Sequence, residues 1–220
     1  MKRTGFILLI GICSTCISIG QQLERLVLRY PMPVYVGTPK DLMDLDRLER
    51  TWEMTLPPFL VPAGTVNIAL NKLVDCGEEI PVLGGPDLVT DGSKEAAEGY
   101  YLELDMGPKS ITIDLEEECT IYAVAVWHYH QKARVYYDVV VQVADDPDFI
   151  VNVNTIYNND YDNSLGFGVG EDLHYIENNK GRLIDGRGVT GRYARFYSNG
   201  NTDNRQNHYL EVEIYGKPNI

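Results

Sequence analysis

The sequence predicts an all-β protein: a jelly-roll β-sandwich of about eight antiparallel strands, preceded by an irregular proline-rich arm. Two observations predict this fold. Short segments in which apolar and polar residues alternate recur along the chain, as in 110–115 and 208–215. Clusters of Gly, Asn and Asp, such as 158–160 and 199–201, separate such segments. Since no helical period of useful length follows Val66, a sandwich or jelly roll is favoured.

The N-terminus has the organisation of a secretory signal peptide. Lys2 and Arg3 give a positive start, and the apolar run 6–12 is too short to span a bilayer. Ser18 and Gly20 are the small residues expected before a cleavage site. We therefore expect cleavage near Gly20, secretion to the extracellular or periplasmic space, and no membrane insertion afterwards. A single membrane anchor is the alternative.

Four cysteines fall into two groups. Cys13 and Cys16 lie in the signal peptide, and a lipoprotein would carry its lipid on one of them, but neither is preceded by Gly, Ala or Ser. Cys76 and Cys119 remain after cleavage, and two cysteines in an exported chain suggest one disulfide. Because sequence does not place their Cα atoms within bonding range, two buried free thiols are the alternative.

The mature chain begins with an arm that is punctuated by proline and poorly periodic. A short helix is expected over 41–50, where leucines recur at helical spacing. The segment 57–62 is extended because residues before proline avoid the α region, and it is too apolar for a solvated linker. We therefore expect the arm to pack on the sandwich. The expected segments are a signal peptide 1–20, the arm 21–64, the domain 65–217 and a C-terminal tail 218–220.

The composition is that of an acidic globular protein. The 32 Asp and Glu residues against 19 Lys and Arg residues give a formal net charge of −13, and 44% of the residues are hydrophobic. Nucleic acids and anionic membranes require clustered Lys and Arg, so neither is an expected partner. The length and the hydrophobic fraction suit one domain with its own core.

The most informative region is a pair of predicted strands joined by a polar loop. Residues 121–127 are almost wholly apolar, as in a strand buried on both faces, whereas 138–144 alternate. The loop around 128–136 carries histidines, tyrosines and basic residues. Since functional groups concentrate on loops held by a rigid scaffold, this loop is the first candidate for a site.

In the last strand, Glu211 and Glu213 are expected to face outward.

Six segments resemble motifs of discoidin-like domains, the coagulation factor type C or galactose-binding-like group. They are VNIALNK at 66–72, LVTDG at 88–92, SITIDL at 110–115, QVADD at 142–146, ARFY at 194–197 and EVEIYG at 211–216. The likeness runs from Val66 to Lys217, and the form with Trp-His-Tyr-His resembles one found in secreted bacterial proteins of uncharacterised function. The resemblance implies a jelly-roll sandwich that binds a glycan, a lipid head group or a protein through loops at one end.

Loops at one end of the domain supply the candidate ligand site. Sugars are recognised by planar polar groups together with an aromatic face, and the loops around 128–136 and 198–208 supply both. The candidate residues are His128, Tyr129, His130, Arg134, Tyr136, Asn199, Asn201 and His208. The resemblance supports them, because sugar-binding members use His, Arg and Asn from comparable loops. Two alternatives stay open: the histidines are satisfied within an ordered loop, or His128 and His130 bind zinc or copper with a third ligand from elsewhere.

The resemblance also implies a structural calcium ion. The implied set is Leu88, Asp91, Ser93 and Glu211. Oxygen ligands gathered at the Asp-Gly turn of Asp91 suit calcium, and a plain turn with an Asx hydrogen bond is the alternative. The loop 160–166 also has alternating oxygen ligands, but its glycine is one residue late, so a solvated loop is favoured there.

The chain shows no nucleophile elbow and no acid pair set apart by an apolar pocket, so a binding role is favoured over catalysis. We predict a secreted, non-catalytic carbohydrate-binding module. The first alternative is an extracellular protein–protein interaction module. The second is a metal-dependent hydrolase that uses His128 and His130.

Overall fold

The structure is a computed structural model that describes residues 21–35, 37, 40–43, 45–50, 57–77 and 80–219. The predicted signal peptide lies outside the described residues, so its cleavage remains a prediction. Within the described ranges, no helix has the length and apolar character needed to cross a membrane.

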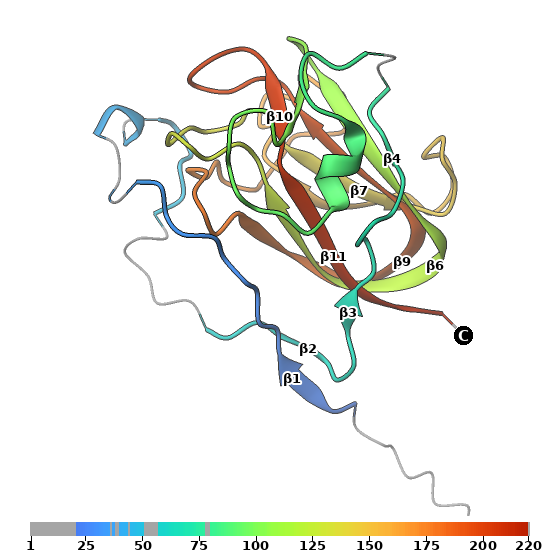
Figure 1. The fold of residues 1–220 in the computed structure, drawn as a ribbon. Coiled ribbons are helices and arrows are strands. Elements are labelled where there is room, and N and C mark those ends of the chain that lie inside the picture. The colour runs from blue at the N-terminus through green and yellow to red at the C-terminus, as the bar shows by residue number, and fades with distance from the viewer. Residues whose placement is uncertain are drawn as a thin grey trace, which may run out of the picture.

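The regular elements of the described chain are strands and short 3-10 turns, joined by loops (Figure 1). In chain order they are β1 (Leu23–Arg25), η1 (Lys40–Leu42), β2 (Leu60–Pro62), β3 (Val66–Asn67), β4 (Val74–Asp75), η3 (Pro86–Thr90), β5 (Leu102–Leu104), β6 (Lys109–Trp127), β7 (Val140–Ala144), β8 (Asn154–Asn158), β9 (Arg182–Ser198), β10 (Asn207–Tyr209) and β11 (Glu211–Pro218). All pairings between these strands are antiparallel. The all-β architecture that the alternating segments predict is therefore confirmed.

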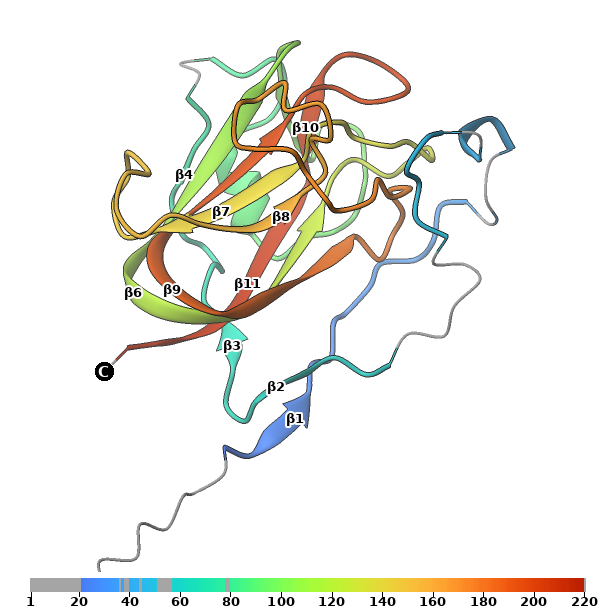
Figure 2. The same cartoon turned by 180° about the vertical axis from the view of Figure 1, so that it is seen from behind.

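Two long strands, β6 and β9, contribute to both layers of the sandwich. They pair from Lys109↔Ser198 to Val126↔Arg182 and curve sharply together (Figures 1 and 2). The first half of β6 also pairs with β4, and its second half pairs with β11. The second half of β9 pairs with β7, which in turn pairs with β8. Both ends of β6 therefore lie at the same end of the sandwich, which we call the loop end.

The main core fills the space between the two layers. Buried side chains from the first layer, such as Val124 and Ile214, belong to one cluster with Ile113, Val141 and Phe196 from the second. Fully burying an aliphatic or aromatic side chain of this size contributes about 1.5 to 3 kcal/mol. The facing apolar positions of the alternating strands thus hold the layers together and give the loops a rigid base.

The separate strands expected over 110–115 and 121–127 are two halves of β6. A register shift between Asp114 and Cys119 and a positive φ of 71° at Glu116 turn the strand without ending it. Such a bulge bends a strand and increases its twist, and here it carries β6 from one layer to the other. The strand predicted to begin at Asp138 begins instead at Val140, since Asp138 has a φ of 52°.

The predicted outward orientation of two glutamates in the last strand is wrong. Glu211 is fully buried and Glu213 is 6% exposed. The segment after η3 covers this face, because the Gly92 amide donates to Glu211 and Lys94 Nζ lies 2.5 Å from Glu213 Oε1. Val212, which lies between the two glutamates on the chain, faces the other way and belongs to the main core.

Neither Cys76 nor Cys119 forms a disulfide, and both thiols are buried in the main core. Of the two possibilities that the sequence left open, the structure has the buried thiols. Burial raises the pKa of the Cys119 thiol, which favours the neutral form.

The arm is a long loop whose base is closed by the pairing of β1 with β2. The helix predicted over 41–50 is wrong: η1 is a single turn, and Arg47 has a φ of 58° that no helix tolerates. Leu48 instead forms a parallel bridge with His174, and Glu49 forms an ion pair with Arg182 at 2.6 Å. These contacts tie the arm to the segment between β8 and β9. The expected domain boundaries stay a prediction.

Candidate functional site

Two loops that were predicted to form a site run side by side at the loop end. Tyr136 pairs with Asn201, and the flanking amide of Tyr137 donates to the Gly200 carbonyl at 3.0 Å. In return, the Asn199 amide donates to the Tyr137 carbonyl at 2.9 Å. These backbone contacts bring the loop after β6 and the loop after β9 together, as the site prediction requires.

His128 lies at the centre of this region and is completely buried. Its Nδ1 is 3.1 Å from Oε2 of Glu177, and its ring stacks on Tyr136 with the centroids 4.2 Å apart. Burial lowers the pKa of His128 to about 3 and raises the pKa of Glu177 to about 8. Because both shifts disfavour charge, burial favours a neutral pair, in which the Glu177 hydroxyl would donate to Nδ1.

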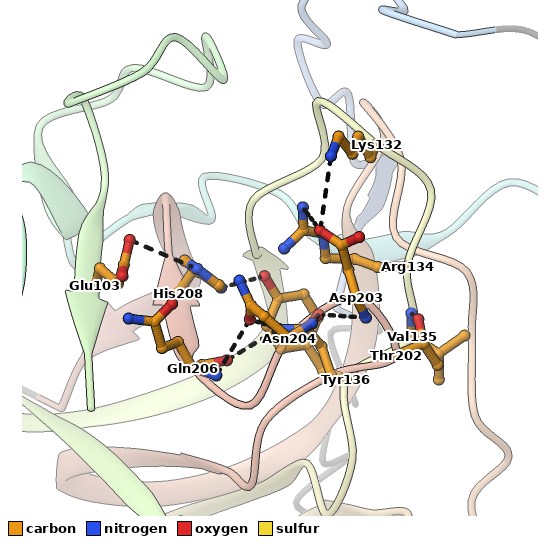
Figure 3. A network of polar contacts seen from close by, with 11 residues as sticks. Glu103, Lys132, Arg134, Val135, Tyr136, Thr202, Asp203, Asn204, Gln206 and His208 are labelled. Carbon is orange, nitrogen blue, oxygen red and sulfur yellow. Dashed lines mark hydrogen bonds and ion pairs between the residues drawn. The ribbon is translucent and has the colours of Figure 1, made fainter. Parts of the chain in front are cut away.

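His208 forms a second buried contact between the same loops (Figure 3). Its Nδ1 is 2.9 Å from the Tyr136 hydroxyl, and its Nε2 is 3.7 Å from Oε2 of Glu103. Burial, followed by the charge of Arg134, lowers the pKa of His208 to about 3. A neutral imidazole can accept from the tyrosine at Nδ1 while its Nε2 hydrogen faces the carboxylate.

Arg134 lies below the surface of the same end. Its Nη2 is 3.1 Å from Oδ2 of Asp203, which also attracts the exposed Lys132 (Figure 3). Its Cζ lies 5.1 Å from the ring centroid of half-buried Tyr129. Nε and Nη1 of Arg134 are buried and have no partner among the residues that the structure describes. Such groups cost free energy unless water or a ligand meets them.

The eight predicted ligand residues thus differ in exposure. His128, His130, Arg134, Tyr136, Asn201 and His208 are buried, whereas Tyr129 and Asn199 are half-buried. His130 donates from Nε2 to the Lys94 carbonyl at 3.2 Å. One nitrogen of each histidine is thus held within an ordered loop, whereas His128 Nε2 and His130 Nδ1 are buried without a partner among the described residues, and direct ligand contact by the buried members stays a prediction.

The open part of this region is a cleft of about 490 Å³ between the two paired loops and the turn before β6. Its lining residues are Met106, Gly107, Tyr137, Asn199, Gly200, Asn201 and Arg205. Tyr137 is half-buried, and Arg205 is exposed. The volume is within the range of small-ligand sites, roughly 300 to 1,000 Å³. Tyr137 and Arg205 were not predicted, because their position beside Asn199 depends on contacts between distant loops.

Asn207 shapes the cleft from beneath and was also missed. Its side chain is fully buried, with Oδ1 accepting from the Gly200 amide at 2.7 Å. Its Nδ2 donates to the carbonyls of Asp105 and Gly107, both at 2.9 Å. One amide group therefore fixes two cleft-lining loops, and no local sequence signal marks such a residue.

Three carboxylates gather beside the cleft. Asp138, Asp160 and Asp162 have ligand atoms within 4.8 Å of one another, and within the described ranges this is the one group of three or more such residues. Asp138 also accepts from Asn199 Nδ2 at 2.8 Å. This group can hold a cation such as calcium. His128 and His130 gain no third ligand at this spacing among the described residues.

No protein-family model and no curated protein matches the chain. Solved structures do match it. Two structures of a family 89 glycoside hydrolase from Clostridium perfringens cover 70% of this chain at TM-scores of 0.52 and 0.51, with 18% and 19% identity. One is in complex with its substrate GlcNAc-alpha-1,4-galactose and the other with 2-acetamido-1,2-dideoxynojirmycin. The chain spans 15% of the length of these enzymes.

A smaller match is the CBM32 of AlyQ in complex with 4,5-unsaturated mannuronic acid, which covers 64% of this chain and 92% of its own length at 20% identity and a TM-score of 0.43. The fold is a discoidin-like β-sandwich that the chain shares with the matched part of the family 89 glycoside hydrolase. The resemblance drawn from the six motifs is thus confirmed at the level of the fold.

A calcium site at the Asp91 turn was predicted from the resemblance to discoidin-like domains, and the predicted set can be compared with the geometry. Asp91 ends η3 in an Asx turn, with Oδ1 accepting from the Ser93 amide at 2.7 Å. Glu211 Oε2 accepts from the Gly92 amide at 3.1 Å, while its Oε1 is buried without a described partner. Burial, together with nearby negative charge, raises the pKa of Glu211 to about 9.

A buried carboxylate with an unsatisfied oxygen fits a cation, which would supply both the missing contact and the missing positive charge. The residues at this turn therefore fit calcium. The contributions of the Leu88 and Ser93 carbonyls stay predictions.

Proposed function

We propose that the chain is a secreted, non-catalytic module that binds a carbohydrate in the cleft at the loop end. The observation that carries the proposal is the cleft itself, which combines the Tyr137 ring with the polar groups of Asn199 and Arg205 on the discoidin-like fold. A sugar presents hydroxyl groups at its edge and a less polar face, so planar donors beside an aromatic ring suit it.

The surrounding contacts keep these groups in place. Asp138 accepts from the Asn199 side-chain amide at 2.8 Å, which orients the amide, and backbone bonds between the paired loops fix Tyr137. Side chains that are oriented before binding lose little conformational entropy on binding. The buried His128–Glu177 pair supports the Arg134 backbone, since the Glu177 amide donates to its carbonyl at 2.8 Å.

Calcium at the Asp91 turn is proposed as a structural ion. It would link the turn after η3 to Glu211 at the start of β11, which pairs with Trp127 at the end of β6. Because β6 leads directly into the loop of His128, the ion would hold this loop from outside the cleft. Its expected effect is on stability and not on direct ligand contact.

An extracellular protein-interaction module is the second candidate. Apolar side chains stand exposed along the arm, with Val27 73% and Met32 81% exposed. Exposed apolar side chains gathered in one segment are more common at protein contacts than on free surfaces.

The test is binding of the mature protein to a glycan array, followed by calorimetry with the glycans that bind. Tyr137→Ala and Arg205→Ala should each weaken binding by about tenfold or more, because each loses roughly 1 to 3 kcal/mol of contact. Arg25→Ala is the matched control, since Arg25 is exposed on β1 at the opposite end of the molecule (Figure 1). Binding that is equally strong in all variants would contradict the cleft as the site.

A further inference from the structure

A row of rings leads from the cleft toward the arm. Tyr137, which lines the cleft, meets the edge of His174 with the ring centroids 5.9 Å apart. On another side of His174 lies Tyr161, with the centroids 5.8 Å apart. His174 is buried, whereas Tyr161 is 47% exposed. The row therefore begins inside the cleft and ends on an accessible aromatic side chain.

The arm completes the far end of this row. Arg47 places its guanidinium carbon 5.9 Å from the ring centroid of Tyr161. Its Nη2 donates to the carbonyls of Gly170 and Glu171, both at 3.2 Å. The His174 amide donates to the Arg47 carbonyl at 2.9 Å, so side chain and backbone are both held.

The conformation of Arg47 carries an energetic cost. Its φ of 58° lies in the left-handed region, which is unfavourable for a residue with a side chain. Strained backbone persists where surrounding contacts over-determine it, and such positions cluster at binding sites. Here the bridge between Leu48 and His174 provides those contacts and directs Arg47 across Tyr161.

We propose that Tyr161 and Arg47 form a second sugar subsite, so that the ligand is an oligosaccharide chain that extends from the cleft to the arm. The inference rests on the proposed function of the cleft. Tyr161 supplies a partly exposed ring whose free face is a stacking platform, and Arg47, which lies over the ring, supplies a cation and donors beside it, as Tyr137 and Arg205 do in the cleft. A single sugar fills the cleft alone, whereas a chain also covers Tyr161.

The arm is then part of the binding surface. Residues 45–50 come from the segment before the domain, and without them Tyr161 would lose the arginine beside it. Continuity supports one ligand over two separate sites, because His174 contacts both tyrosines. The affinity gained at the second subsite multiplies the affinity of the cleft, because one linked molecule makes both contacts.

The test uses the mature full chain and an array of linear glycans in which each series runs from monosaccharide to hexasaccharide. The wild type should bind the longer members of a series more tightly than the shorter ones. Tyr161→Ala should weaken binding of the longer members by about tenfold and leave the shortest binding member unchanged. Tyr161→Phe keeps the ring and should retain most of the length dependence. Arg47→Gln should reduce it.

Tyr100→Ala is the matched control, because Tyr100 is another exposed tyrosine, 67% exposed, outside this row. Circular dichroism and a thermal melt check that each variant is folded. If Tyr161→Ala binds all lengths like the wild type, the second subsite is overturned while the cleft proposal stands. If it weakens all lengths equally, the extended ligand is overturned. A wild type that binds no glycan overturns both proposals.

Discussion

Replacing Glu177 by glutamine tests whether the buried pair with His128 is neutral. The Glu177 carboxyl has a pKa of about 8 in the folded chain, against an ordinary value of 4.5, because it is fully buried. Between these two pH values the folded chain keeps a proton that the unfolded chain releases. Stability contributed by this group is therefore complete below pH 4.5 and is lost as the pH rises toward 8.

The loss amounts to about 1.4 kcal/mol per pH unit, or roughly 3 kcal/mol between pH 5 and pH 7.5. Glu177→Gln mimics the protonated acid, since its amide can donate to His128 Nδ1 as the carboxyl hydroxyl does. His128 has the opposite dependence: its pKa of about 3 lies below the ordinary 6.5, so its contribution is lost as the pH falls from 6.5 toward 3. Because both proteins contain His128, its effect cancels in their difference.

The assay is urea unfolding of the wild type and Glu177→Gln at several pH values from 5 to 8. The variant should become progressively more stable relative to the wild type as the pH rises. Glu117→Gln, at an exposed position, is the control and should show no such trend. A pH-independent difference between wild type and Glu177→Gln would refute the reasoning, because Glu177 would then be ionised throughout this pH range in both the folded and the unfolded chain.

Three other changes test separate parts of the structure. Glu211→Gln should remove any rise in melting temperature that calcium gives the wild type, and a wild type that melts alike with calcium and with chelator would contradict the calcium site. Asn207→Ala should lower the free energy of unfolding by about 2 to 4 kcal/mol, because it leaves buried loop groups without partners; a loss below about 0.5 kcal/mol in denaturant titration would argue against its role. Glu49→Gln breaks the ion pair with Arg182 and should increase protease cleavage within the arm, whereas unchanged cleavage would show that the backbone bridge alone holds it.

The fold was predictable because local signals agree along the chain. Alternation places Ile111, Ile113 and Val212 in the core, where the structure has them. The bend of β6 was not predictable, because the run of glutamates that includes Glu116 interrupts the apolar alternation, as the end of a strand would. Whether such a segment ends or bends the strand depends on its pairing partners, which are distant in sequence.

The loop end was located from the sequence, but its division into buried and open parts was not. Polar residue types in a loop suggest exposure, yet His128 is buried because Tyr136 and Glu177 pack on it. Tyr137, by contrast, lines the cleft although it adjoins Tyr136. Neighbouring residues of an extended segment face opposite ways, so one shift in register decides which of the two is accessible.

The passage of β6 and β9 through both layers also has a kinetic consequence. Neither layer can lose its hydrogen bonds without breaking those of a strand that the other layer shares. The two layers therefore exchange their amide hydrogens as one cooperative unit, and the amides of paired, fully buried residues in these strands, such as Val124 and Ala194, require global unfolding to exchange. The arm is held to the sandwich by the buried Val61 of β2 and by the Leu48–His174 bridge, and it shares no strand with either layer, so it can open in a separate and faster step.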